Sequence, residues 1–127
     1  MSLQNPLGRV LGLGAAKEGV HHWWVQRLTS IALIPLTVWF VVSLLAMPAY
    51  DYTTLVSWIA HGWTPILLVM FIAVSAWHSK LGVQVVVEDY VHGGVKTLSL
   101  ILSTFAHTLV AAAAIFAVLK VAFGITT

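Results

Sequence analysis

A histidine, a glycine and an acid–tyrosine pair stand in order at one end of a long apolar segment: His78, Gly82, Asp89 and Tyr90. On an α-helix, the eleven residues from His78 to Asp89 make about three turns. The two side chains then lie near one face, roughly 16 Å apart along the axis. Gly82 shares that face and leaves room for a flat group to approach the backbone. This arrangement indicates a buried redox cofactor beside a small-molecule site at the water boundary.

His78 is the candidate ligand for that cofactor. Ionisable residues inside a membrane cost free energy and usually serve a function, and neutral imidazole is a common axial ligand of haem iron. The alternative is a histidine hydrogen-bonded to a neighbouring helix, and spacing alone leaves both interpretations open. Gly82, one turn further on, favours the interpretation of His78 as a ligand, because a porphyrin can approach the helix closely where there is no side chain.

Asp89 and Tyr90 are the candidates for the small-molecule site. A phenol can donate a hydrogen bond to a quinone carbonyl, and a nearby carboxylic acid can relay protons to it. The alternative is an interfacial tyrosine of an aromatic belt beside a solvated acid. The residue types alone favour this alternative.

Polar and aromatic residues crowd the segment before the first apolar stretch, where His21 and Arg27 stand six apart. The guanidinium of Arg27 suits the carboxylates of haem propionates. The alternative is an arginine that sets membrane topology beside tryptophan anchors, and without further context it is the safer interpretation.

Two other residues lie at membrane depth. His107 lies about 15 Å inside the Lys96 end of its segment, so a pair of iron ligands formed by His78 and His107 is conceivable. The alternative for His107 is a hydrogen bond to a residue such as Ser103. Lys80 lies about 200° around the helix from His78, so we expect its ammonium to extend toward the aqueous boundary or to meet a partner group.

Composition determines the class of protein that must position these residues. Of the 127 residues, 60% are hydrophobic and 8% are charged, against about a quarter charged in soluble domains. The chain must therefore reside in a membrane. It contains no cysteine, which excludes disulfides and cysteine-held iron–sulfur clusters. Its formal net charge of +2 is too small to indicate nucleic acid binding.

Three charge-free stretches each exceed the roughly 20 residues that cross a bilayer as an α-helix: 28–50, 52–79 and 97–119. The sequence predicts an all-α membrane protein, with an arm over residues 1–20 and a three-helix transmembrane anchor over 21–127. We expect the helices at about 28–47, 60–87 and 97–123. The distribution of Lys and Arg puts the N-terminus in the cytoplasm and the C-terminus on the opposite side.

With these residues in place, the chain resembles the hydrophobic membrane-anchor subunit of succinate dehydrogenase (respiratory complex II), of the D type. That family carries a histidine, a glycine four residues later, and an Asp-Tyr pair eleven and twelve after the histidine. Its N-terminal element resembles GVHHWWVQRLTS, with the histidine and arginine at His21 and Arg27. The resemblance covers essentially the whole chain.

The resemblance implies that His78 ligates the iron of haem b, with the second axial histidine supplied by the sister cytochrome b anchor subunit. It implies that Gly82 packs against the haem and that Arg27 and His21 contact its propionates. Tyr90 and Asp89 would form part of the ubiquinone site. The chain alone would have no catalytic activity, and it would tether the flavoprotein and iron–sulfur subunits to the membrane lipid.

Two other interpretations remain open: a self-contained cytochrome b using His78 and His107, and a haem-free structural anchor. Some family members lack haem, or use menaquinone and run as fumarate reductases. Within this family, the HHWW sequence resembles an alphaproteobacterial or mitochondrion-like version. The resemblance therefore implies a bacterial inner membrane, with the mitochondrial inner membrane as the alternative.

Overall fold

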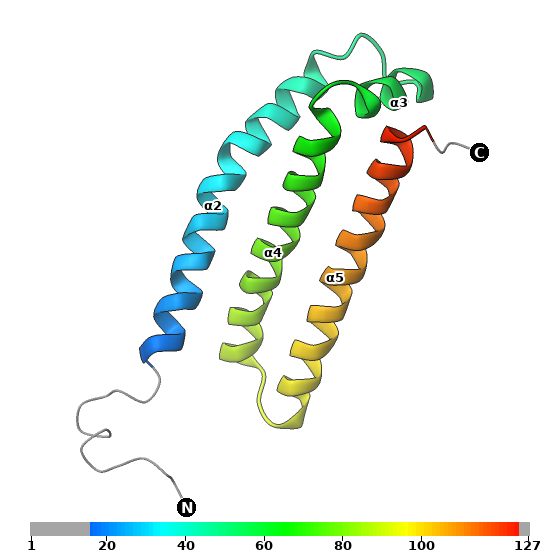
Figure 1. The fold of residues 1–127 in the computed structure, drawn as a ribbon. Helices are drawn as coiled ribbons and strands as arrows, with labels where there is room; N and C mark the ends of the chain where they lie inside the picture. The colour runs from blue at the N-terminus through cyan, green and yellow to red at the C-terminus, as the bar shows by residue number, and fades with distance from the viewer. Residues whose placement is uncertain (1–15, 125–127) are drawn as a thin grey trace, which may run out of the picture.

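The computed structural model describes the backbone of residues 16–124 and the side chains of residues 19–124. This part of the chain is all α-helical and contains no strand (Figure 1). The helices are α2 (Ala16–Leu45), α3 (Tyr52–Ala60), α4 (Thr64–Tyr90) and α5 (Gly94–Ala122). Helices α2, α4 and α5 are each long and apolar enough to cross a membrane, which confirms the predicted fold class.

The three long helices stand side by side with α4 in the middle (Figure 1). Helix α4 packs against both α2 and α5. Among the described side chains, the buried hydrophobic residues are Leu36, Leu68, Leu81 and Val118. Residues 19–124 therefore have almost no core of their own, and their apolar side chains need lipid or a partner subunit to cover them.

Helix α2 begins well before the predicted residue 28, because it continues through the polar segment that precedes the apolar stretch. Hydropathy detects only the part of a helix that lies in hydrocarbon, whereas Val20–Gln26 contains no residue that breaks a helix. The helical start at Ala16 falls inside the predicted arm, and residues 1–15 lie outside the described part. Pro35 lies within α2, and the helix ends at Leu45, before Pro48 as expected.

The short helix α3 was not predicted, and it separates α2 from α4 at the end of the bundle opposite the start of α2 (Figure 1). Asp51 caps it by accepting hydrogen bonds from the Thr54 amide and from the hydroxyls of Thr53 and Thr54. These bonds to the charged form lower the pKa of the Asp51 carboxyl to about 2. Gly62, with φ of 55°, then allows the turn into α4. The predicted start at residue 60 was early because the apolar run hides this turn.

Aromatic side chains join α2, α3 and α4 at this end. The Trp39 and Trp58 rings stack with centroids 6.2 Å apart, and the Phe40 and Phe71 rings stack at 5.0 Å. Such pairs add roughly 0.5–1.5 kcal/mol each beyond their buried area. They attach α3 to the bundle and fix the distance between α2 and α4.

A tight link joins α4 to α5 at the other end, beside the start of α2 (Figure 1). Gly93 adopts φ of 68°, which glycine tolerates best, and it caps α5. The ammonium of Lys96 donates to the carbonyl of Glu88 over 3.1 Å, which satisfies one of the last carbonyls of α4. Helix α4 runs to Tyr90, about a turn past the predicted end at 87, and α5 starts at Gly94, about a turn before the predicted start at 97.

Candidate functional site

The half-buried His78 of α4 faces α2 and contacts two of its polar side chains. Its Nδ1 lies 2.9 Å from the Thr29 hydroxyl oxygen, and its Nε2 lies 3.4 Å from the Gln26 side-chain nitrogen. The α2–α4 interface thus holds a small polar cluster at the depth where the sequence predicts a cofactor ligand.

The bonds of Thr29 allow His78 to carry its proton on Nδ1. The Thr29 hydroxyl donates to the backbone carbonyls of Val25 and Gln26, at 2.9 and 3.0 Å. Its oxygen can then accept from a proton on Nδ1 of His78. In that tautomer Nε2 carries a lone pair, which the Gln26 amide meets only at the long distance of 3.4 Å. This is the tautomer in which Nε2 can bind a metal ion.

Two polar atoms beside this cluster are buried without a hydrogen-bond partner: Gln26 Oε1 and His22 Nε2. His22, Gln26 and Thr29 are spaced i, i+4 and i+7, so they share one face of α2. A buried polar atom without a partner costs about 1–3 kcal/mol. The cluster is therefore incomplete in the single chain, and His78 Nε2 is the atom in it that could ligate a haem iron.

Gly82 lies one turn from His78 and also faces α2. A Cβ atom at Gly82 would lie 3.9 Å from the Gln26 side-chain nitrogen, which is ordinary van der Waals contact. The described chain therefore has room for alanine at this position, and any stricter need for glycine must come from a group that the chain does not supply.

Arg27 and His21 are exposed on α2. Arg27 follows Gln26 directly, so its side chain is turned about 100° from that of Gln26. Its guanidinium lies 5.4 Å from the Trp23 ring centroid, in a cation–π contact. The structure brings neither residue into the His78 cluster, whereas the neighbouring His22 lies half-buried on the same face as Gln26.

Asp89 and Tyr90 are the last two residues of α4, and both are exposed. Tyr90 is 79% exposed, so its phenol is open to a small molecule or a partner subunit. They lie about 16–18 Å from His78 along the helix axis. The carboxyl and the phenol therefore stand at the end of the helix that carries His78.

His107 makes the kind of hydrogen bond that the sequence offered as its alternative role. Its Nδ1 donates to the backbone carbonyl of Ser103 at 2.8 Å, and its Nε2 accepts from the Ser79 hydroxyl at 3.2 Å. Its ring therefore joins α5 to α4, while His78 faces α2. The two imidazoles engage different helices, which speaks against a haem shared between them.

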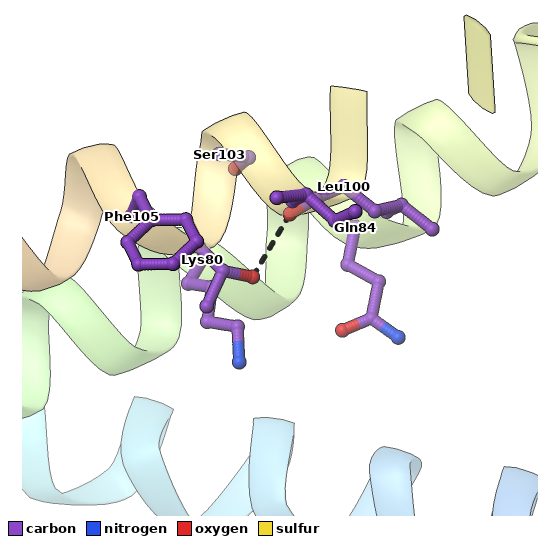
Figure 2. Close-up of a pocket in the computed structure, with 7 residues that line it drawn as sticks. Lys80, Gln84, Leu100, Ser103 and Phe105 are labelled. Carbon is purple, nitrogen blue, oxygen red and sulfur yellow. Dashed lines mark hydrogen bonds between the residues drawn. The ribbon is translucent and has the colours of Figure 1, made fainter. Parts of the chain in front are cut away.

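Lys80 lies between α4 and α5, where it lines a hollow of about 330 Å³ together with Gln84 (Figure 2). The remaining lining residues belong to α5 and include Leu100, Ser103 and Phe105. The Lys80 ammonium also lies 5.3 Å from the Trp77 ring centroid. This hollow contains neither His78 nor Tyr90, so it is separate from the predicted cofactor and quinone positions.

Thr29, Gln26 and His22 are the residues of this site that sequence reasoning missed. Threonine and glutamine are common enough to attract no notice singly. Their signal is the spacing of three polar residues along one face of a helix that is otherwise apolar. Had α2 been predicted from Ala16, that face would have been visible.

Comparisons with known proteins agree with this architecture. A family model described as succinate dehydrogenase/fumarate reductase transmembrane subunit matches residues 1–119. The chain is 34% identical over 95 residues to the succinate dehydrogenase hydrophobic membrane anchor subunit of Rickettsia conorii, covering 72% of this chain and 75% of that protein. It is 26% identical over 113 residues to the subunit of the same name from Paracoccus denitrificans, covering 89% and 88%.

The same name belongs to a protein of Rickettsia felis that is 32% identical over 100 residues, covering 77% of this chain and 83% of the relative. No solved structure matches the chain. The family match spans nearly the whole sequence, and the three apolar helices agree with the name that these relatives share. As a multi-pass membrane anchor subunit, the chain is part of an enzyme complex and is not catalytic by itself. The chain therefore belongs to the succinate dehydrogenase/fumarate reductase transmembrane subunit family.

Proposed function

We propose that this anchor subunit serves succinate:ubiquinone oxidoreductase by providing one axial ligand of haem b and part of the ubiquinone reduction site. His78 is the ligand, and Tyr90 with Asp89 forms this chain's share of the quinone site. The observation that carries the proposal is that one helix, α4, holds both: a half-buried imidazole with an available Nε2 and an exposed phenol at its end.

The polar cluster between α2 and α4 supports the role of His78. The Thr29 oxygen lies 2.9 Å from Nδ1, where it can accept from Nδ1–H and leave Nε2 the lone pair that iron needs. Gln26 meets that lone pair only weakly, and its own Oε1 is buried without a partner. When bound, haem b supplies a one-electron redox centre beside the quinone site. The sister cytochrome b subunit would provide the second axial histidine.

The position of Tyr90 supports its role in quinone binding. Its phenol can donate a hydrogen bond to a carbonyl of ubiquinone, and it stands at the end of the bundle where a lipid-soluble ring and aqueous protons meet. Asp89 precedes it and is also exposed, so its carboxyl can exchange protons with water and pass them toward the reduced quinone.

Three other residues would complete the haem pocket. Arg27 and His21 would contact the propionates, since both are exposed on α2 near the level of the His78 cluster and the guanidinium of Arg27 suits a carboxylate. Gly82 would let the porphyrin approach the α4 backbone. In the chain alone, its neighbour is the Gln26 amide.

The broad faces of the helix layer would pack against the sister anchor subunit and lipid. Large apolar side chains are exposed along all three long helices, such as Ile34, Val86 and Phe105. The flavoprotein and iron–sulfur subunits would bind at the end that carries Tyr90. By the positive-inside rule, this end faces the cytoplasm of a bacterial inner membrane.

The experiment is to purify the complex through a tag on this chain in mild detergent and to measure two activities. A flavoprotein, an iron–sulfur protein and a second small anchor should co-purify. We expect Tyr90→Phe to slow succinate–ubiquinone turnover while succinate oxidation with an artificial acceptor stays at the wild-type rate. Tyr52→Phe, which alters a 72% exposed tyrosine at the opposite end, is the matched control. Unchanged quinone turnover in Tyr90→Phe would refute the quinone site.

A further inference from the structure

We propose that Thr29 is a positioning residue that sets the tautomer of His78 and lowers the reduction potential of the iron that His78 binds. The proposal rests on the proposed role of His78 as an axial ligand. It concerns a residue of α2 that touches neither iron nor quinone and acts only through the imidazole.

The geometry places Thr29 as an acceptor for an imidazole that binds iron. Its hydroxyl lies 2.9 Å from the Val25 carbonyl and 3.0 Å from the Gln26 carbonyl, one turn back on its own helix, so its proton can bond to either of them. An imidazole that binds iron through Nε2 carries its remaining proton on Nδ1. The Thr29 oxygen, 2.9 Å from Nδ1, is then in place to accept that hydrogen bond.

The bond also has an electronic effect. A histidine that donates its second ring N–H becomes a more basic ligand, and its ring orientation is held. A more basic ligand stabilises ferric iron more than ferrous iron. Thr29 should therefore keep the haem potential lower than it would be with an unbonded imidazole.

Gln26 has the complementary part in the same cluster. Its amide meets His78 Nε2 at 3.4 Å, the nitrogen that iron would take. Iron and this amide compete for one lone pair, so Gln26 must release Nε2 when iron binds. Thr29 contacts the other nitrogen, so its bond is compatible with the ligated imidazole.

A Thr29 with a purely structural role would also join α2 to α4, so the test must measure properties of the haem iron. We would compare the complexes carrying Thr29→Val and Thr29→Ser by redox titration of the haem and by low-temperature electron paramagnetic resonance. Valine keeps the β-branched shape and removes the acceptor, whereas serine keeps the hydroxyl. Thr108→Val is the matched control, because the Thr108 hydroxyl donates only to the Thr104 carbonyl within α5.

We expect Thr29→Val to retain haem and to shift its midpoint potential upward, with a changed low-spin resonance signal. Thr29→Ser and Thr108→Val should match the wild type. If Thr29→Val fails to assemble, Thr29→Cys decides, since its thiol is a weaker acceptor and should give a smaller upward shift. An unchanged potential in haem-loaded Thr29→Val or Thr29→Cys would overturn the proposal.

The failure of this inference can be distinguished from a failure of the proposed function. If His78→Ala removes the haem signal while the Thr29 variants leave the potential unchanged, His78 is a ligand and Thr29 does not tune it. If the complex that carries His78→Ala keeps the wild-type haem spectrum, the ligand assignment itself is wrong.

Discussion

The Ser79 hydroxyl lies 3.2 Å from Nε2 of His107, although Ser79 is the immediate neighbour of His78. Adjacent residues of α4 thus bond to different helices, His78 to α2 and Ser79 to α5. Because successive helical residues are turned by about 100°, α4 can serve both partners at one depth. The two membrane histidines thereby have different roles, one in the proposed cofactor site and one in helix packing.

His107→Leu should leave the haem of the complex in place. The change removes one hydrogen bond between α4 and α5, which in a membrane is worth about 0.6 kcal/mol and at most about 2 kcal/mol. We expect an unchanged haem spectrum and a slightly lower unfolding temperature in detergent. Loss of haem from a complex that still assembles would mean that His107 is a ligand after all.

Gly82→Ala tests whether a cofactor lies against α4. The chain alone has room for the new Cβ, which would meet only the Gln26 amide at 3.9 Å. Alanine also favours a helix over glycine by about 1 kcal/mol. We therefore expect an intact, fully assembled complex with reduced haem content, measured as haem per flavin. Full haem content would remove Gly82 from the pocket. Gly19→Ala, at an open position on α2, is the control.

Asp89→Asn should slow ubiquinone reduction by about tenfold or more, since an amide cannot pass a proton to the quinone. The rate should fall most at high pH, where protons are scarce. Glu88→Gln is the matched control on the same turn, because the Glu88 carboxylate accepts from the Gln84 amide instead of serving the site. Equal rates in Asp89→Asn and the wild type across pH would contradict the proton-supply role.

Asp51 should make the stability of α3 depend on pH in acid. Its carboxyl has a pKa of about 2 in the folded chain against 3.8 when free, because Thr53 and Thr54 bond to the charged form. The stabilisation is therefore complete above pH 3.8 and is lost as the pH falls through about 2. Circular dichroism in detergent should show acid loss of helix in the wild type. That specific step should be absent in Asp51→Asn, and a persisting step would assign it to another group.

Much of this fold could be predicted from composition alone. Apolar stretches longer than a bilayer crossing must be helices, and the structure has them. Helix ends were less predictable, since caps and turn residues determine them. Asp51 and Gly62 define α3 and the turn into α4 within an unbroken apolar run. At the other end of α4, Lys96 donates to the Glu88 carbonyl in the last turn.

The candidate site was predictable in part. The spacing from His78 to Tyr90 predicts an imidazole and a phenol on one helix, and the structure places both residues on α4. The role of His78 as a ligand stays a prediction. The bonds of His78 to Thr29 and Gln26 were not predictable, because they join residues about fifty positions apart in the sequence. They depend on the register between α2 and α4. Hydropathy does not determine that register.

The reduced-minus-oxidised absorption spectrum of the complex purified with His78→Ala tests the central claim most directly. We predict that the b-type haem bands of the wild-type complex are lost or displaced, while His107→Ala keeps them and both variants still oxidise succinate with an artificial acceptor. Wild-type haem bands in His78→Ala would contradict the account.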